Sequence, residues 1–351
     1  MERKKILGQY FTTNQQYILS GMKIPDNVVN IIEPFAGEEH LLNFITDRSR
    51  YNIECFDIDP KKEHIIRQDT INYPPSYYNK FIITNPPYLA RNKTECKIAF
   101  DNYDTNDLFK CFLKNLTVNH CLGGIVIVPL NFWSSIRKKD ILLRKSFLEQ
   151  YKIIQLNIFE ENVFDDTSYA VCSFQFEKTE VGNANYKPIE ITLHITIYPS
   201  KTEVISILND TNNYLIGGEI YHLPTKGKFK ISRLTKNNLD RQNTNILVKC
   251  IDDNQKNKIG LSMVNDENIY VDTTPNNTAR TYATLVIEPK IDIETQTIVV
   301  KKFNSLLDEY RNKYNSLFLS NYRESKDLAR KRISFDLVYS LVEHILDFKM
   351  I

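Results

Sequence analysis

Hydrophobic and polar positions alternate along the first half of the chain in two different ways. Short, β-branched apolar runs bounded by polar or turn residues predict strands, and longer segments between them are helical candidates. Strand–helix–strand repetition favours parallel strands joined by crossovers, and therefore an open α/β sheet. The predicted strands are 28–34, 52–58, 80–84, 123–130, 152–159 and 168–176, the last two as a final hairpin, and the predicted helices are 40–47, 105–120 and 136–150.

The pattern changes after about residue 178. A polar linker at 181–188 is followed by period-two alternation at 189–199, and a similar run covers 280–287, as half-exposed strands show. From Lys301 onward the pattern becomes helical, with apolar residues at three- and four-residue spacing in 334–346. We therefore expect two domains, 1–178 and 179–351, of which the second is mixed α+β.

Composition excludes several classes of protein. The 45 Lys+Arg and 43 Asp+Glu give a net charge of only +2, which argues against a polycation that binds nucleic acid over its whole surface. No stretch approaches the ~20 apolar residues that a bilayer span needs, so we expect no membrane association. The six scattered cysteines indicate reduced thiols and a cytoplasmic location, and the six histidines show no metal-ligand spacing, so no metal site is predicted.

Three polar segments fall where an open α/β sheet binds ligands, at the carboxyl ends of its strands. The run Glu33-Pro34-Phe35-Ala36-Gly37 ends the first strand, and Gly37 lets a ligand approach the backbone. Asp57 ends the second strand, where ribose hydroxyls are held, although a solvated strand-end aspartate would look the same. Asp69 could accept a hydrogen bond from an adenine amino group or could equally cap a turn.

The run Asn85-Pro86-Pro87-Tyr88 follows the third predicted strand directly. Two prolines fix the backbone, remove two N–H donors and force Asn85 into an extended conformation. The Asn85 side-chain oxygen and the Pro86 carbonyl can accept both protons of an exocyclic amino group, which directs its lone pair at an electrophilic methyl group. Tyr88 offers a face on which a planar group can stack.

These motifs resemble those of the S-adenosylmethionine-dependent DNA N6-adenine methyltransferases of restriction–modification (type II) type. The resemblance covers about residues 7–176, beginning with Leu7-Gly8-Gln9-Tyr10-Phe11-Thr12, and it implies a Rossmann-like methyltransferase sheet followed by a target-recognition domain. It implies a stacking role for Phe164 opposite Tyr88, with Tyr169 as the alternative. Glu39 departs from the family, since a second glycine often stands at its position. The implied cofactor-binding residues are Gln9, Tyr10, Thr12, Glu33, Phe35, Ala36, Gly37, Asp57, Ile58, Asp69, Thr70 and Asn85, and the implied catalytic residues are Asn85, Pro86, Pro87, Tyr88 and Phe164.

The resemblance favours S-adenosyl-L-methionine as cofactor and adenine in double-stranded DNA as substrate, and it leaves open a companion restriction endonuclease that acts independently. Ribosomal-RNA adenine dimethylases share the Leu-Gly-Gln-x-Phe motif but typically carry Asn-Leu-Pro-Tyr. Release-factor glutamine methyltransferases share Asn-Pro-Pro-Tyr but carry their extra domain before the sheet. An RNA adenine methyltransferase and a degenerate fold that only binds DNA or a partner remain as alternatives.

Basic residues gather in the second half of the chain. Between 226 and 249 there are seven Lys/Arg and one acidic residue, Asp240, and the alternation of Lys226, Lys228 and Lys230 would place three ammonium groups on one face of a strand. Such a face suits phosphate contacts, although lysines that protect an edge strand would look the same. The candidate DNA-binding residues are Lys226, Lys228, Lys230, Arg233, Arg280 and Arg323.

Overall fold

The computed structural model describes residues 8, 12–161, 163–164, 170–179, 190–252, 258–273, 281–325 and 328–348, with the backbone alone for 321–325 and 328–330. The chain divides into two compact units, Met1–Tyr214 and Leu215–Ile351. Among the helices of the described residues, none combines the length and the apolar character that a bilayer span needs.

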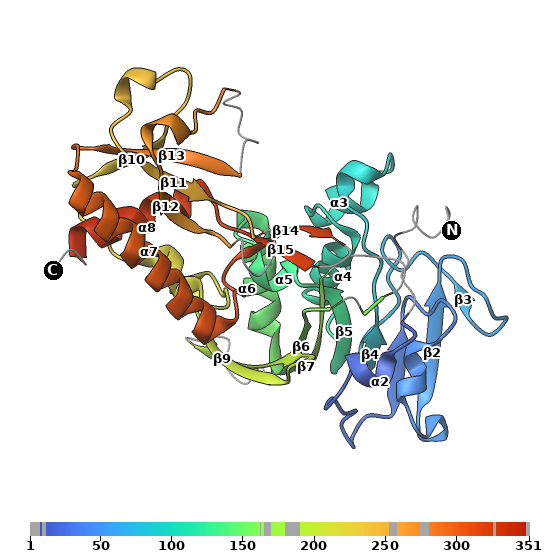
Figure 1. Cartoon of the computed structure of the whole chain (residues 1–351). Coiled ribbons are helices and arrows are strands. Elements are labelled where there is room, and N and C mark those ends of the chain that lie inside the picture. Colours follow the sequence, from blue (N-terminus) through green and yellow to red (C-terminus); the bar gives the residue numbers. More distant parts are fainter. Residues whose placement is uncertain are drawn as a thin grey trace. The chain divides into compact units, whose positions relative to one another are not determined.

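Within the described residues, the first unit contains a nine-stranded sheet in the order β3-β2-β1-β4-β5-β7-β6-β8-β9 (Figure 1). The strands from β3 to β5 pair in parallel, and β7 runs antiparallel between β5 and β6. This confirms the predicted α/β class, a mostly parallel sheet with a hairpin of β6 and β7. The strands are β1 (Asn30–Glu33), β2 (Asn52–Asp57), β3 (Ile66–Arg67), β4 (Phe81–Thr84), β5 (Gly123–Pro129), β6 (Tyr151–Phe159), β7 (Val171–Lys178), β8 (Ile191–Tyr198) and β9 (Thr202–Leu208).

The two longest helices of this unit differ in how their buried faces are built. In α4 the apolar residues recur at helical spacing, whereas the buried face of α6 also carries Asp140 and Arg144; the two helices pack against each other. An aromatic cluster lies beside them, in which Trp133 is fully buried and contacts Phe132 and Phe174 at ring-centroid distances of 4.8 and 5.4 Å. The helices are α2 (Gln15–Ile18), α3 (Ile98–Tyr103), α4 (Leu108–Leu116), α5 (Asn131–Ser134) and α6 (Lys138–Gln150).

Two expectations for this unit differ from the structure. The first unit ends after Tyr214 rather than at residue 178, because β8 pairs with β6 and β9 pairs with β8, so both strands extend the first sheet. The predicted helix 40–47 is only a 3₁₀ turn, Leu41–Phe44. The β-branched pair Ile45–Thr46 follows it, and Asp47 caps the next short turn instead of continuing a helix.

The second unit is mixed α+β, as predicted. Its described residues contain a four-stranded antiparallel sheet in the order β10-β13-β11-β12, a two-stranded ribbon and two helices. The predicted strand 280–287 lies inside the sheet and is buried along most of its length, so the expectation of a half-exposed strand was wrong. The first helix begins at Ile293, earlier than expected, because Asp292 caps it by accepting from Thr295 N. The elements are β10 (Lys230–Arg233), β11 (Ile246–Lys249), β12 (Gly260–Met263), β13 (Tyr282–Glu288), α7 (Ile293–Tyr314), β14 (Ser320–Ser325), β15 (Leu328–Arg332) and α8 (Phe335–Phe348).

Candidate functional site

A pocket of about 300 Å³ opens at the carboxyl ends of β1, β2 and β4. The sheet changes direction of strand order between β1 and β4, which is where open α/β sheets bind ligands. Most of the predicted cofactor residues that the structure describes line this pocket: Phe35, Gly37, Asp57, Ile58, Asp69, Thr70 and Asn85, together with the predicted catalytic Pro87.

The Asp57 carboxylate joins two of the loops around the pocket. One of its oxygens accepts a hydrogen bond from Gly37 N at 2.8 Å, and the other accepts from Asp59 N at 2.7 Å. Asp57 is only 3% exposed, so both oxygens are held in place by the backbone. A carboxylate oxygen can accept more than one hydrogen bond, so the Asp57 carboxylate suits a hydroxyl group of a ligand in the pocket.

Glu39 explains how the first loop forms without a second glycine. Its φ is +61°, in the left-handed region that glycine usually occupies. Its buried carboxylate accepts from Lys62 Nζ at 2.6 Å and Cys55 Sγ at 3.3 Å, and it lies 2.8 Å from His64 Nε2. Burial opposes ionisation, but the hydrogen bonds from these three side chains outweigh it and lower the pKa of Glu39 to about 2. Glu39 therefore ties the first loop to the segment between β2 and β3.

Glu33 is the opposite case. It is 2% exposed, and its Oε2 has no hydrogen-bond partner among the described residues. Burial raises the pKa of Glu33 well above its usual range, and the charge of Glu39 acts in the same direction. A cation that reached this carboxyl would favour its ionised form.

The Asn85 side chain is held between two partners. Tyr88 Oη lies 2.5 Å from Asn85 Oδ1 and 2.9 Å from the Ile127 carbonyl oxygen, so its single proton can be donated to either. Asn85 Nδ2 donates to Thr12 Oγ1 at 3.2 Å. The amide that the sequence singled out is therefore oriented by Tyr88 and by the N-terminal segment.

The loop after β4 is also fixed through its backbone. Tyr88 N donates to the Gly8 carbonyl at 2.9 Å, and Gly8, with φ +68°, packs so closely that a Cβ atom would lie 2.7 Å from Tyr88 O. The Tyr88 ring is 1% exposed and meets Phe109 edge-on at 6.2 Å. A base that stacks on Tyr88 must therefore displace the residues that cover this ring.

Asp69 and Thr70 make local contacts as well as lining the pocket. Asp69 Oδ1 accepts from the backbone N–H groups of Ile71 and Asn72, both at 3.1 Å, which is the geometry of a turn cap. Thr70 Oγ1 donates to the Pro34 carbonyl at 2.8 Å and so supports the first loop. The proposed contact of Asp69 with adenine stays a prediction beside this structural role.

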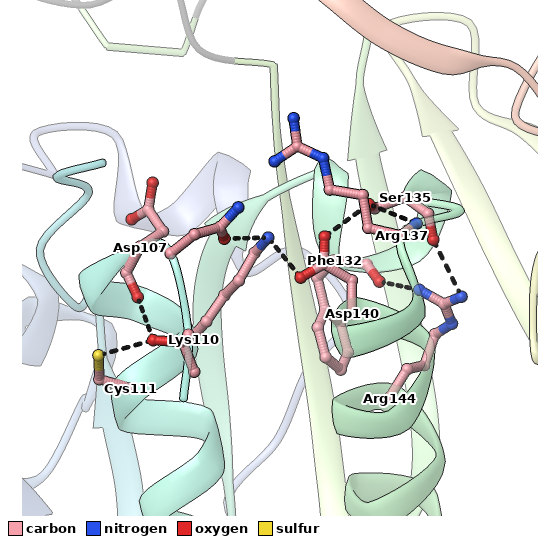
Figure 2. A network of polar contacts seen from close by, with 10 residues as sticks. Asp107, Lys110, Cys111, Phe132, Ser135, Arg137, Asp140 and Arg144 are labelled. Atoms are coloured by element: carbon pink, nitrogen blue, oxygen red, sulfur yellow. Dashed lines mark hydrogen bonds and ion pairs between the residues drawn. The ribbon is translucent and has the colours of Figure 1, made fainter. Parts of the chain in front are cut away.

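Sequence reasoning missed the segment that closes the pocket from the other side. Asp107 Oδ1 accepts from Leu89 N at 3.1 Å, and Leu108 N donates to the Leu89 carbonyl at 3.2 Å, so the start of α4 holds the end of the loop after β4. Burial raises the pKa of Asp107 to about 6, against the opposing effect of Lys110 (Figure 2). The apolar residues of 98–108, within an otherwise polar stretch, could have indicated that this segment packs against the pocket. The missed lining residues are Gln68, Ile71, Asn72, Leu89, Thr94, Cys96, Ala99, Phe100 and Leu108.

Other predicted residues lie outside the pocket lining or outside the described residues. Phe164 is buried, at 4% exposed, in the segment after β6, and its stacking role stays a prediction. Thr12, Glu33, Ala36, Pro86 and Tyr88 are described but do not line the pocket, whereas Gln9, Tyr10 and Tyr169 fall outside the described residues.

The basic residues of the second unit do not share a strand face. Strand β10 begins only at Lys230, and Gly227, with φ +68°, turns the chain before it, so the expectation of three lysines on one strand was wrong. Lys226 lies over the Phe348 ring at 4.4 Å, and Lys228 and Lys230 are exposed. Arg233 pairs with buried Asp272 at 3.1 Å and has a structural role beside any contact with DNA. Arg280 falls outside the described residues, as does the side chain of Arg323.

The described residues contain no group of three or more His, Cys, Asp or Glu side chains that could hold a metal ion. All six cysteines are free, and Cys96 is the exposed one.

Comparisons with known proteins give a partial likeness. No protein-family model and no curated protein matches the chain. Three solved structures share part of its architecture. A modification subunit assigned to a type I restriction enzyme from Vibrio vulnificus is 15% identical, with a TM-score of 0.43, over 56% of this chain and 48% of that one. A type I restriction-modification methyltransferase subunit from Streptococcus thermophilus is 12% identical, with a TM-score of 0.39, over 53% and 45%. The M protein of the type I restriction enzyme EcoKI is 13% identical, with a TM-score of 0.39, over 88% and 72%.

This chain therefore spans about half the length of the first two of these proteins. At such identities and TM-scores, the likeness carries no argument about chemistry.

Proposed function

We propose that the chain is an S-adenosylmethionine-dependent DNA methyltransferase that modifies N6 of an adenine flipped out of the duplex. The proposal rests on one observation above all. The Asn85 side chain, from the end of β4, lines the same pocket as the Asp57 carboxylate, from the end of β2. A group that can hold ribose hydroxyls and an amide that can hold amino protons thereby share one cavity.

The residues around the pocket fit the cofactor. Gly37 has φ +52° and presents a loop surface without a side chain, next to the Asp57 carboxylate. The Glu33 carboxyl is buried outside the pocket lining, so it would contact the cationic amino group of the cofactor's methionine part only if the lining moved aside. Ile58, 43% exposed at the pocket, suits the flat face of an adenine ring. When bound, the cofactor supplies an electrophilic methyl group.

The chain's own contribution is to hold and orient the amino group of the target base. Asn85 Oδ1 and the Pro86 carbonyl accept hydrogen bonds from the two N–H groups of this amino group. These bonds direct the nitrogen lone pair at the methyl group and stabilise the developing positive charge. Asn85 Oδ1 is within reach of Tyr88 Oη, whose proton must rotate away first. The Ile127 carbonyl, 2.9 Å from the same hydroxyl, gives the Tyr88 proton another acceptor without movement of the ring.

The test is transfer of labelled methyl groups from S-adenosylmethionine to genomic DNA, followed by nucleoside analysis and mapping of the modified sites. We expect N6-methyladenine with the wild type. For Asn85→Ala we expect kcat to fall by about 100- to 1,000-fold, the range found for the loss of one transition-state hydrogen bond, with cofactor binding by calorimetry largely intact. Asn27→Ala, at an exposed asparagine of the same unit, is the matched control.

Each alternative has its own outcome. Near-normal transfer by Asn85→Ala would overturn the mechanism. Equal or greater incorporation into RNA than into duplex DNA would favour an RNA adenine methyltransferase. No binding of S-adenosylmethionine by the wild type would overturn the assignment as an enzyme and favour a binding subunit.

A further inference from the structure

Three consecutive cations follow α5 on the side of the sheet where the pocket opens. Strand β5 pairs in parallel with β4, so the segment after β5 leaves the sheet at the same edge as Asn85. This segment continues through α5 to Arg137, Lys138 and Lys139, which are all exposed. We call residues Ser135–Lys139 the cationic loop.

Both ends of the cationic loop are fixed by buried polar contacts. Lys110, 5% exposed, pairs with Asp140 at 2.7 Å, and Asp140 accepts from Ser135 Oγ at 2.6 Å. The fully buried Arg144 donates to the carbonyls of Phe132 at 2.7 Å and Ser135 at 3.2 Å (Figure 2). The loop backbone is therefore held from the protein interior.

The Arg137 side chain is directed away from this network (Figure 2). Together with Lys138 and Lys139 it lines a second pocket, of about 440 Å³, which shares Phe100 with the cofactor pocket. The two pockets are therefore neighbours within the first unit.

The charges around this second pocket do not cancel. Arg91 pairs with Asp101 at 2.6 Å, Lys139 pairs with Asp104, and Asp140 pairs with Lys110. Among the described residues, neither Arg137 nor Lys138 has an acidic partner within ion-pair distance. Because Lys110, from outside the lining, pairs with Asp140, two cations of the lining are left without an acidic partner among the described residues.

These two cations stand at the end of a helix where the dipole does not favour them. Arg137 and Lys138 occupy the N-cap and first position of the 13-residue helix α6. The helix dipole favours acidic residues at this end and opposes basic ones. A run of cations against the local preference, on a rigid support, indicates a role in contacting a polyanion.

We propose that Arg137 and Lys138 contact phosphates of duplex DNA beside the target nucleotide, and that the cationic loop positions the strand against the cofactor pocket. This inference rests on the proposed function and adds a contact surface on the first unit itself. Phosphate contacts fix the register of a protein on DNA without reading its sequence. Because Lys110, Asp140 and Arg144 hold the cationic loop in place, the loop would keep the DNA backbone at a constant distance from Asn85.

The experiment uses the full chain and a fluorescein-labelled, mixed-sequence duplex, with affinity measured by anisotropy between about 50 and 200 mM salt. The slope of log K against log salt is negative, and each lost phosphate contact reduces its magnitude by about 0.9. We therefore expect R137Q/K138Q to reduce the magnitude of the slope by about 2 and to weaken DNA binding about tenfold at the lower salt. In methyl transfer, the KM for DNA should rise more than kcat falls. The Kd for S-adenosylmethionine should stay at the wild-type value.

The matched control is K152Q/K178Q, which removes two exposed charges from the other end of the same sheet, at the start of β6 and the end of β7. It should leave the salt slope unchanged. An unchanged slope in R137Q/K138Q, or an equal change in the control, would overturn the inference while wild-type transfer to DNA still upheld the proposed function. A wild type that binds the duplex but transfers no methyl group would overturn the proposed function alone, and one that does not bind the duplex would overturn both.

Discussion

The two units of the chain use their polar side chains in different ways. In the first unit, polar groups from separate strand ends meet around one pocket: Asp57 holds the backbone of Gly37, and Asn85 lies between Tyr88 and Thr12. In the second unit, the candidate cations are spread. Lys228 and Lys230 are exposed, and Arg233 forms an ion pair with Asp272. Chemistry that needs fixed relative positions constrains residue type and spacing, whereas attraction to a polyanion needs only charge and leaves a much weaker pattern.

The largest effect that would sharpen this contrast is expected at Asp57. In Asp57→Asn, one of the two backbone donors, Gly37 N or Asp59 N, would face an amide NH₂ group, and the charged acceptor for a ligand hydroxyl would be lost. Hydrogen bonds to charged groups contribute about 1.5–3 kcal/mol, so we expect the Kd for S-adenosylmethionine to rise by about 10- to 100-fold. Calorimetry measures this directly.

Asp59→Asn is the control for that substitution. Asp59 is the adjacent acidic residue and pairs with Lys61 at 2.6 Å, but its side chain does not line the pocket. If both substitutions weaken cofactor binding equally, the effect is one of local charge, and the contrast between the two units loses its basis.

A smaller effect concerns the half-buried carboxyl of Asp107. Because burial raises its folded pKa to about 6, above the usual value of 3.8, the folded state holds a proton that the unfolded state has lost between these pH values. Stability from this group is therefore present below about pH 4 and is lost as pH rises through 6. Asp107→Asn keeps an acceptor for Leu89 N without the charge, and it should be the more stable form at neutral pH, by about 2 kcal/mol.

Thermal melting from about pH 4 to pH 7 measures that difference. The gain in melting temperature of Asp107→Asn over the wild type should grow with pH, whereas Asp26→Asn, at an exposed position, should show no such trend. A constant difference across this range would mean that Asp107 is ionised in the folded protein throughout.

The smallest effect is expected in the second unit. Lys228→Gln should lower the salt slope of DNA binding by about 0.9 and weaken binding a few-fold, without changing cofactor affinity. Arg233→Gln should instead lower the melting temperature, because it removes the ion pair that Arg233 makes with the buried carboxylate of Asp272. Anisotropy and melting curves separate the two roles. A large loss of cofactor binding from Lys228→Gln would break the contrast between the units.

The sequence predicted the sheet of the first unit well, because buried parallel strands are continuous apolar runs whose ends carry the ligand-binding residues. Asp57, Gly37 and Asn85 could be found for this reason. The end of the first unit could not be predicted. Strands β8 and β9 alternate like half-exposed strands, and that pattern does not show which sheet they join. Asp107 was missed because its role is to accept from one backbone N–H of a distant loop, and such a contact imposes no spacing on the sequence.

Glu39 has a consequence for protein engineering. A left-handed residue other than glycine is an obvious target for stabilisation, because glycine would relieve about 1 kcal/mol of backbone strain. At this position, glycine would also remove the acceptor shared by Lys62, Cys55 and His64, and with it the link between the two loops beside the pocket. A redesign that placed glycine here would thus relieve backbone strain and at the same time loosen the pocket's geometry.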